Sequence, residues 1–170
     1  MAKTLTLQDM YIGHLKDMWS AETQILRTLP KMIKTASNSK LKRALEKHLK
    51  ETEGHAARIE QVFQSLDASP RGKKCVGMEG LLEEGKEAMA QEYVSSDLMD
   101  SALIGGGQKV EHYEICGYRD LIHMAGLLGD NKAVNLLTKS LREEEAANQK
   151  LAELGETIVT REAVPNGQSR

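Results

Sequence analysis

Four glutamates stand on the apolar stripes of four predicted helices, where acids are rarely found. In each of four segments, apolar residues recur at steps of three and four, which is the pattern of one buried helix face. Near the middle of each stripe lies one acid, and the four are Glu22, Glu51, Glu114 and Glu144. Because a buried carboxylate is costly unless a counter-charge pairs with it, the pattern indicates bound cations among these residues.

The spacing of neighbouring residues extends this set. His55 follows Glu51 by four positions, and Asn148 follows Glu144 by four. Residues at i and i+4 share a helix face, so the two pairs look like a degenerate repeat in which one imidazole is replaced by an amide. Carboxylates and imidazoles suit iron or manganese, and bridging carboxylates can hold two such ions together. We therefore predict a site for two iron or manganese ions.

Three further residues could orient the predicted ligands. His48 lies one turn before Glu51, and Tyr118 lies one turn after Glu114. Metal ligands are usually held in place by hydrogen bonds from surrounding groups. We expect His48, Tyr118 and the amide of Asn148 to have this orienting role.

Counting residues from each predicted turn places the four acids at a common height. Glu22 lies about 16 residues before the turn at Asn38, and Glu51 lies about 13 after it. Glu114 and Glu144 lie about 16 before and about 14 after the turn at residue 130. With a constant rise of about 1.5 Å per residue, all four fall within about one helical turn of each other.

Each residue taken alone also has an ordinary explanation. Glu22 could lie partly exposed on the flank of its helix, and Glu51 could form a surface ion pair with Lys47. The acids at 111, 114 and 144 stand in charged runs, which are typical of a solvated face. His48 and His55 could be hydrogen-bonded core histidines. The coincidence of helical phase and height on all four helices favours the metal site.

The order and length of the predicted helices define the fold that would position these residues. Long helices are predicted from about residue 6, where Thr6 and Asp9 form a capping box, and over about 40–66, 97–128 and 131–158. A short turn at about 37–39 makes the first two long helices an antiparallel hairpin, and a short turn at about 129–130 does the same for the last two. A connection of about 30 residues, with a short helix near 80–92, joins the two hairpins. The prediction is all-α, a ferritin-like four-helix bundle with two antiparallel hairpins and a long crossover.

The limits of the bundle and one interruption can also be read from the sequence. A single domain over residues 1–159 is expected from the chain length, followed by a disordered tail at 160–170 that contains Pro165 and Gly167. The glycine run 105–107 lies inside a predicted helix, where each glycine costs about 1 kcal/mol relative to alanine. We expect this run to permit close packing between helices.

Composition excludes several functional classes. The net charge of −2 gives no indication of nucleic acid or an anionic membrane as a partner. No apolar run approaches the ~20 residues of a membrane span, and the N-terminal residues lack the apolar core of a signal peptide, so we expect a cytoplasmic protein. The two cysteines have neither zinc nor redox spacing and are expected to be unlinked thiols. No phosphate loop, nucleophile triad or nucleotide fingerprint identifies a substrate.

Five short segments resemble a known family. They read LRTLPKM at 26–32, HLKET at 48–52, GLLEEG at 80–85, KVEHYEI at 109–115 and LREEE at 141–145. Together they resemble the YciE/YciF-like family of bacterial ferritin-like proteins, over about residues 7–156. The resemblance implies a ferritin-like bundle, often a homodimer, with a di-metal centre and a role in bacterial stress responses.

By position, the resemblance also implies a set of six metal ligands, which are Glu22, Glu51, His55, Glu111, Glu114 and Glu144. Glu111 and Glu51 are then the best candidates to bridge two ions. The Glu-x-x-His spacing of ferritins is absent, because Glu51 and His55 are four positions apart, and Asn148 stands where related chains commonly have an acid. An amide is a weak neutral ligand, so the second ion could be loosely held or absent.

Two functional hypotheses follow from these observations. In the first, the chain is a di-metal protein of the stress response that reacts with a small oxidant such as peroxide or oxygen. In the second, it is a structural or interaction protein without turnover, in which one ion or none joins the helices. An iron-storage cage is a third possibility, but nothing in the sequence argues for a shell of many subunits.

Overall fold

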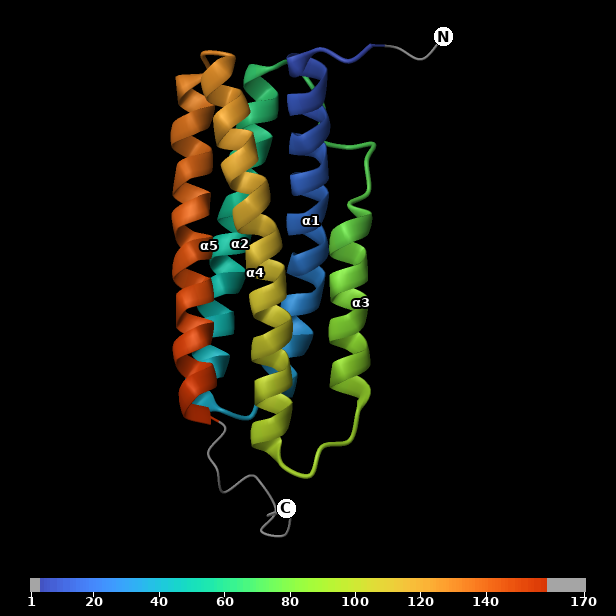
Figure 1. The fold of residues 1–170 in the computed structure, drawn as a ribbon, viewed down its shortest axis with the longest axis vertical. Coiled ribbons are helices and arrows are strands. Elements are labelled where there is room, and N and C mark those ends of the chain that lie inside the picture. Colours follow the sequence, from blue (N-terminus) through green and yellow to red (C-terminus); the bar gives the residue numbers. More distant parts are fainter. Residues whose placement is uncertain (1–3, 159–170) are drawn as a thin grey trace, which may run out of the picture.

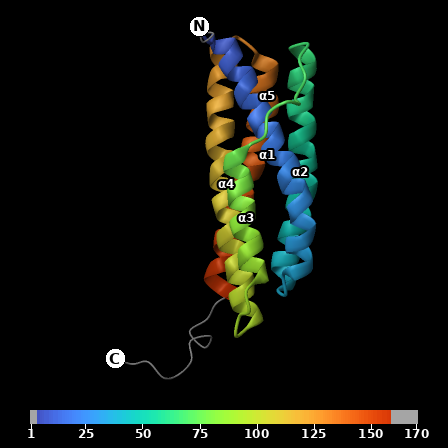
Figure 2. The ribbon, with the colours of Figure 1, turned by 90° about the vertical axis from the view of Figure 1, so that its right-hand side faces the viewer.

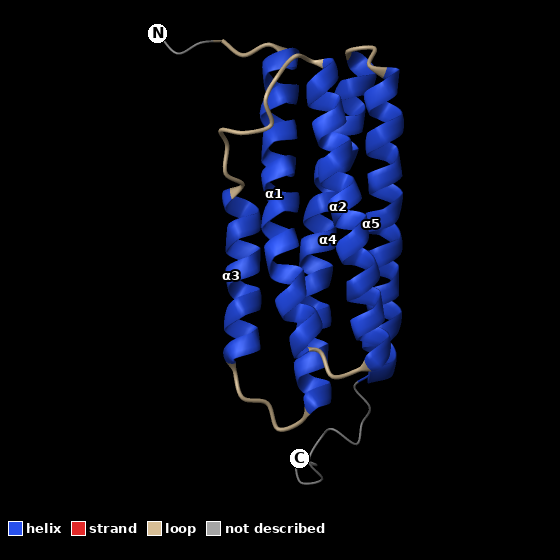
Figure 3. Ribbon diagram, turned by 180° about the vertical axis from the view of Figure 1, so that it is seen from behind, coloured by secondary structure: helices blue, strands red, loops and turns tan. Residues whose placement is uncertain are grey.

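Five helices form the fold in the computed structural model, which describes residues 4–158. They are α1 (Leu7–Thr35), α2 (Ser39–Ser65), α3 (Val76–Ala90), α4 (Ser96–Leu127) and α5 (Asn131–Ile158). No strand occurs among residues 4–158. The four long helices lie side by side along the longest axis of the molecule, and α3 flanks them (Figure 1, Figure 3). The prediction of an all-α protein is confirmed.

Local signals at the helix ends account for where the long helices begin. The Thr6 side chain accepts a hydrogen bond from the backbone N–H of Asp9, and the Asp9 carboxylate accepts one from the backbone of Thr6, so the predicted capping box is present. Asn38 caps α2 in the same way, accepting from two backbone N–H groups. Gly129 has a φ of +74°, which favours glycine, and Asp130 then accepts from a backbone N–H at the start of α5.

Two short connections and one long connection join the four long helices. Short turns link α1 to α2 and α4 to α5, and the helices of each pair run antiparallel (Figure 1). α1 packs against α2 and α4, and α5 packs against the same two helices, so the four long helices enclose a common core. The segment 66–95 crosses between the two hairpins and carries α3, which packs against α1 and α4 (Figure 2).

The helix α3 begins four residues earlier than predicted, at Val76 instead of Gly80. Its start is fixed by Cys75, whose Sγ accepts a hydrogen bond from Met78 N. The backbone of Cys75 is in turn bound to α1, because its N–H donates to Ser20 Oγ at 3.0 Å and its carbonyl accepts from Gln24 at 3.0 Å. These contacts are tertiary, so no local sequence signal marks them. Both cysteines are free thiols, as predicted.

The turn between α1 and α2 is held by a buried acid from another helix. Asp100, near the start of α4, is fully buried. Its carboxylate accepts hydrogen bonds from the backbone N–H groups of Ser37 and Asn38, both at 2.8 Å, and from the Ser37 hydroxyl at 2.6 Å. Charge-assisted bonds of this kind join the first hairpin to α4 at one end of the core.

The glycine run of α4 permits close packing at only one of its three positions. A Cβ added to Gly107 would lie 2.9 Å from Leu151 Cδ1, so α5 does approach closely here. A Cβ at Gly105 or Gly106 would meet no atom of the described residues within 4 Å. The prediction of close packing therefore holds for Gly107 and is wrong for its two neighbours.

Two further predictions from the sequence concern the limit of the domain and the absence of a membrane-spanning helix. The domain limit at residue 159 and the tail at 160–170 lie outside the described residues. In the part of the chain that the structure describes, no helix combines the length and the apolar character needed to cross a bilayer.

Candidate metal centre

Six buried ionisable side chains gather in the core between the four long helices. The helices α1 and α5 contribute one residue each, and α2 and α4 contribute two each. The six are Glu22, His48, His55, Glu111, Glu114 and Glu144, and none is more than 5% exposed. Each stands on the apolar stripe of its helix, so the packing that buries the stripe also carries these groups into the core.

Their ligand atoms form two groups that share one residue. The His48 group consists of His48, Glu111, Glu114 and Glu144, and the His55 group consists of Glu22, His55 and Glu144. Within each group, one nitrogen or oxygen from every member lies within 4.8 Å of the others. Glu144 belongs to both groups, so its two oxygens could serve two ions.

Individual distances show how closely the side chains approach. His48 Nε2 lies 3.3 Å from Glu111 Oε1, and His48 Nδ1 lies 3.8 Å from Glu144 Oε2. His55 Nδ1 lies 2.7 Å from Glu144 Oε1 and 3.5 Å from Glu22 Oε1. Each histidine therefore lies between carboxylates that come from different helices.

Many of the buried polar atoms in these groups have no hydrogen-bond partner among residues 4–158. They include one oxygen of Glu22, one of Glu111, both of Glu114 and Glu144, and Nδ1 of His48 and His55. Some lie close together, as His55 Nδ1 and Glu144 Oε1 do, yet without hydrogen-bond geometry. Carboxylate and imidazole groups that converge in this way could hold a cation, and oxygen and imidazole ligands suit iron or manganese.

Burial and mutual repulsion shift the protonation of the acids. Burial, followed by repulsion from neighbouring carboxylates, raises the pKa values of Glu111 and Glu114 well above the ordinary value of a glutamate. Burial opposes ionisation of Glu144 too, but its contacts with His55 and His48 outweigh burial and lower its pKa. Without metal, the His48 group therefore retains protons that a bound cation would displace.

A chain of polar contacts holds His55 from outside the groups. Its Nε2 lies 3.0 Å from Glu143 Oε2, Glu143 Oε1 accepts a hydrogen bond from Arg58 Nη2 at 3.2 Å, and Arg58 Nη1 donates to Ser140 Oγ at 2.8 Å. In the neutral ring that a metal ion requires, an Nε2–H donated to Glu143 would leave the Nδ1 lone pair facing Glu144 and Glu22, which is the usual arrangement of a metal-bound histidine. Burial alone would lower the pKa of His55, but the contacts with Glu144 and Glu22 raise it to about 10.

Two residues that hold His55 through polar contacts, Glu143 and Arg58, were not predicted from the sequence. Glu143 lies in the charged run 143–145, in which helical phase singles out Glu144 alone. One signal was available, because Arg58 follows His55 by three positions and so lies on the same side of α2. What it would contact could be known only once α5 was placed beside α2.

The predicted orienting residues take different places. Tyr118 is fully buried and its hydroxyl donates to Glu22 Oε1, so it lies where an orienting group should. Asn148 is half-buried, and its Oδ1 has no hydrogen-bond partner within the described part of the chain. His48 lies inside the cluster, in the position of a possible ligand and not merely beside one.

Glu51 is the one predicted ligand that the structure does not bring into either group. Its side chain is 18% exposed and forms an ion pair with Lys47, as the alternative explanation proposed. At 100° per residue, Glu51 lies about 50° to one side of the line through His48 and His55. Thr52 lies about 50° to the other side and is fully buried. Glu144, and not Glu51, is therefore placed to bridge, and a ligand role for Glu51 stays a prediction.

The amino-acid sequence matches known proteins over most of its length. Residues 6–164 match a family described as a domain of unknown function, DUF892. Protein YciF of Escherichia coli (strain K12) is 42% identical over 159 residues, which cover 93% of this chain and 95% of that protein. The resemblance inferred from the five short segments is confirmed by these matches.

Solved structures extend the comparison to the fold. The crystal structure of the E. coli stress protein YciF superposes with a TM-score of 0.88, covering 93% of this chain and 99% of that one. YcfI, a proposed structural protein of Rhodopseudomonas palustris, is 41% identical with a TM-score of 0.83, covering 87% and 94% of the two chains. A protein of Xanthomonas campestris pv. campestris has a TM-score of 0.72 at 20% identity and shares the fold alone.

Proposed function

This chain belongs to the DUF892 family and is a homologue of the E. coli stress protein YciF, and from that premise we propose that it binds two divalent ions, iron or manganese, in a ferritin-like four-helix bundle. Its role would be in a bacterial stress response. One observation carries the proposal: unpartnered carboxylate oxygens and imidazole nitrogens from all four long helices converge in two groups that share Glu144.

The arrangement of the helices supports the ferritin-like part of the proposal. Two antiparallel hairpins joined by one long crossover are the topology of ferritin-like bundles, and their metal sites lie in the bundle core with acids from each helix. Here α1, α4 and α5 each provide at least one buried glutamate, whereas α2 provides two histidines.

The residues divide into holding and positioning roles. His48, Glu111 and Glu114 would hold one ion, Glu22 and His55 the other, and Glu144 both. When bound, such ions can pass electrons to a small oxidant such as peroxide or oxygen. Glu143 keeps the His55 ring oriented, Tyr118 holds Glu22, and the complete burial of Glu22, Glu114 and Glu144 excludes bulk water.

Metal analysis tests the proposal directly. Protein purified under reducing conditions and reconstituted with iron(II) or manganese(II) is expected to bind two ions per chain, measured by mass spectrometry of the metals after gel filtration. Glu144→Gln should lose both ions, because both groups share that carboxylate. Glu145→Gln is the matched control, since Glu145 is exposed and pairs with Arg119. Failure of the parent protein to retain either metal contradicts the proposal.

The alternative is a structural or interaction protein without turnover. It is favoured by two observations: Glu51 lies outside both groups, and the R. palustris relative is described as a structural protein. Rapid consumption of peroxide or oxygen by the reconstituted protein, lost in Glu144→Gln, rules this alternative out. A homodimer is part of the proposal under either hypothesis, and sedimentation equilibrium measures it.

A further inference from the structure

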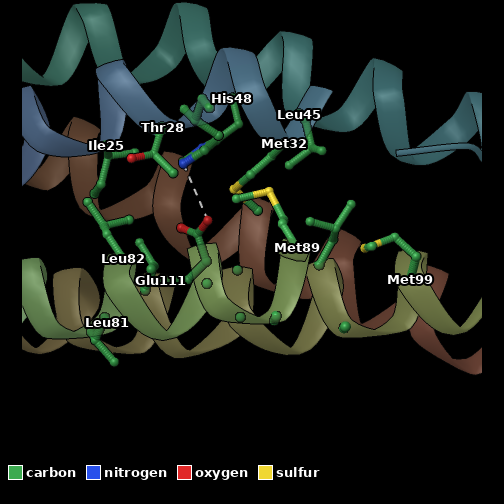
Figure 4. A pocket seen from close by; sticks show the side chains of 18 residues that line it. Ile25, Thr28, Met32, Leu45, His48, Leu81, Leu82, Met89, Met99 and Glu111 are labelled. Carbon is green, nitrogen blue, oxygen red and sulfur yellow. Dashed lines mark ion pairs between the residues drawn. The ribbon is translucent and has the colours of Figure 1, made fainter. Parts of the chain in front are cut away.

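An apolar cavity of about 40 Å³ lies beside the His48 group. It is lined by residues of α1, α2, α3 and α4, and Figure 4 shows His48 of α2 and Glu111 of α4 facing each other, with their ion pair drawn as a dashed line. Apart from the Thr28 hydroxyl, the rest of the labelled lining is hydrocarbon and thioether, with Met32, Met89 and Met99 prominent (Figure 4). The cavity therefore joins an almost wholly apolar space to one end of the candidate metal centre.

The lining offers a polar guest few partners. The Thr28 hydroxyl donates to the Gln24 carbonyl, so its hydrogen is already engaged. Among residues 4–158, the ionisable side chains that line the cavity are those of His48 and Glu111, and both belong to the His48 group. A small polar molecule such as hydrogen peroxide would have to give up most of its hydrogen bonds with water to enter. An apolar molecule has no such hydrogen bonds to lose when it enters.

The size of the cavity selects among apolar guests. A cavity needs roughly 10–15 Å³ to hold one water molecule, and dry cavities of about 150 Å³ hold benzene. A space of about 40 Å³ is too small for an aromatic ring or an alkyl chain but accommodates a diatomic gas or a xenon atom. Apolar cavities of this kind remain dry, which leaves them open to such guests.

From size, lining and position we propose that this cavity holds dioxygen next to His48 and Glu111, and that dioxygen rather than hydrogen peroxide is the oxidant the site is built to admit. This inference rests on the proposed metal-binding function, because it assigns the oxidant for that same site. The dioxygen molecule would be bound by the residues that line the cavity.

Glycines keep the space open. Gly85 of α3 and Gly106 of α4 both line the cavity, and a Cβ at either would meet no atom of the described residues within 4 Å. A Cβ added to Gly105 of α4 or Gly80 of α3 would also meet no atom of the described residues within 4 Å. These two glycines are exposed and lie outside the lining. Gly107 also lines the cavity, but a Cβ there would meet Leu151, so Gly85 and Gly106 are the positions suited to substitution, each with a matched control in the same helix.

Xenon tests the cavity without any metal. Crystals of the metal-free protein under xenon pressure are expected to show one xenon atom in the cavity by anomalous scattering. The atom should remain in Gly105→Leu and disappear in Gly106→Leu, whose side chain fills the space. An empty cavity in the parent protein overturns the inference, whereas xenon bound in a protein that retains no metal overturns only the proposed function.

Kinetics test the choice of oxidant. In protein loaded with iron(II) to equal content, Gly106→Leu is expected to slow the reaction with dioxygen about tenfold more than the reaction with hydrogen peroxide, while Gly105→Leu slows neither. Gly85→Leu, with Gly80→Leu as control, fills the cavity from α3 and decides the matter if Gly106→Leu does not fold. Equal slowing of both oxidants, or of neither, by the filling variants overturns the inference.

Discussion

The two groups of the candidate metal centre differ in how well their side chains are supported. In the His55 group, Tyr118 donates to Glu22, and Glu143 with Arg58 holds the histidine. In the His48 group, both oxygens of Glu114 and one of Glu111 have no partner among the described residues. The His48 group also borders the apolar cavity. One half of the site is therefore held in place before metal arrives, whereas the other contains buried carboxyl oxygens without hydrogen-bond partners.

Under the proposed function, this difference predicts that two bound ions are held unequally. Pre-oriented ligands lose less freedom on binding, so the ion of the His55 group should be the tighter one. The sequence led to a related expectation, that one ion is loosely held, but from Asn148. The structure suggests a different reason: Glu111 and Glu114 have oxygens without hydrogen-bond partners among the described residues, and His48 Nε2 has a contact of 3.5 Å with the Thr52 hydroxyl.

The largest expected effect is a pair of opposite changes in the stability of the metal-free protein. Glu114→Met removes a buried acid with two unpartnered oxygens and should raise the free energy of unfolding by about 1–3 kcal/mol. Glu22→Met leaves the buried Tyr118 hydroxyl without its acceptor and should lower it by about 1–3 kcal/mol. Urea unfolding in the presence of a chelator measures both. Changes of the same sign would contradict the contrast between the two groups.

The second prediction concerns metal affinity. Glu143→Gln weakens the contact that orients His55, and should reduce the affinity of the tighter ion about 10- to 100-fold while the weaker ion changes by less than about threefold. Competition with a chromophoric chelator resolves the two ions. The exposed neighbour in Glu145→Gln is the control and should change neither affinity. An equal loss at both ions would mean that Glu143 supports the bundle in general.

The third prediction is a pH dependence that reverses when metal binds. In the metal-free protein, the raised pKa values of Glu111 and Glu114 mean that the folded state binds more protons than the unfolded state above about pH 4.5. Their contribution to stability is therefore present at low pH and lost as the pH rises through the raised values. Each such proton contributes at most about 1.4 kcal/mol per pH unit.

Metal binding displaces these protons, so metal affinity should rise with pH over the same range. Chemical unfolding at a series of pH values, with and without metal, measures both slopes. Glu114→Gln should flatten the metal-free slope because it removes one titrating group, and Glu145→Gln should leave it unchanged. A metal-free protein that gains stability steadily from pH 5 to about 8 would be inconsistent with protonated acids in the core.

The smallest expected effect tests Glu51. Lys47→Met removes its ion-pair partner and frees the carboxylate to turn toward the His48 group. If Glu51 can ligate, the affinity of the weaker ion should rise, by about two- to threefold, since an exposed ion pair contributes less than about 1 kcal/mol. Titration with manganese(II) followed by electron paramagnetic resonance measures this. No change in affinity would assign Glu51 to the surface and leave the sequence prediction without support.

Much of the architecture could be predicted because its signals are local. Thr6 with Asp9, Asn38 and Gly129 mark helix ends through contacts within a few residues, and the predicted bounds of α2, α4 and α5 lie within about one residue of those observed. The start of α3 was misplaced because Cys75 is fixed by residues of α1, far away in the sequence.

In the candidate site, the residues at the centre of each stripe were identified correctly as buried. Glu22, His55, Glu114 and Glu144 all lie in the core, because a residue at the middle of an apolar face points inward for almost any arrangement of neighbouring helices. Residues at the edge of the stripe were harder to assign. Glu51 was expected inside, but its side chain is partly exposed and pairs with Lys47, whereas Glu143, which the pattern did not single out, contacts His55.

The sequence by itself determined the helices, the hairpins and which acids lie at the centres of the buried faces, since helical phase and capping depend on neighbours within about one turn. Only the tertiary structure decided that His48 joins the cluster, that Glu144 is shared between the two groups and that a cavity borders Glu111. A side chain some 50° from the centre of a stripe is covered or exposed according to where the adjacent helix lies, and that position is set by packing across the whole bundle.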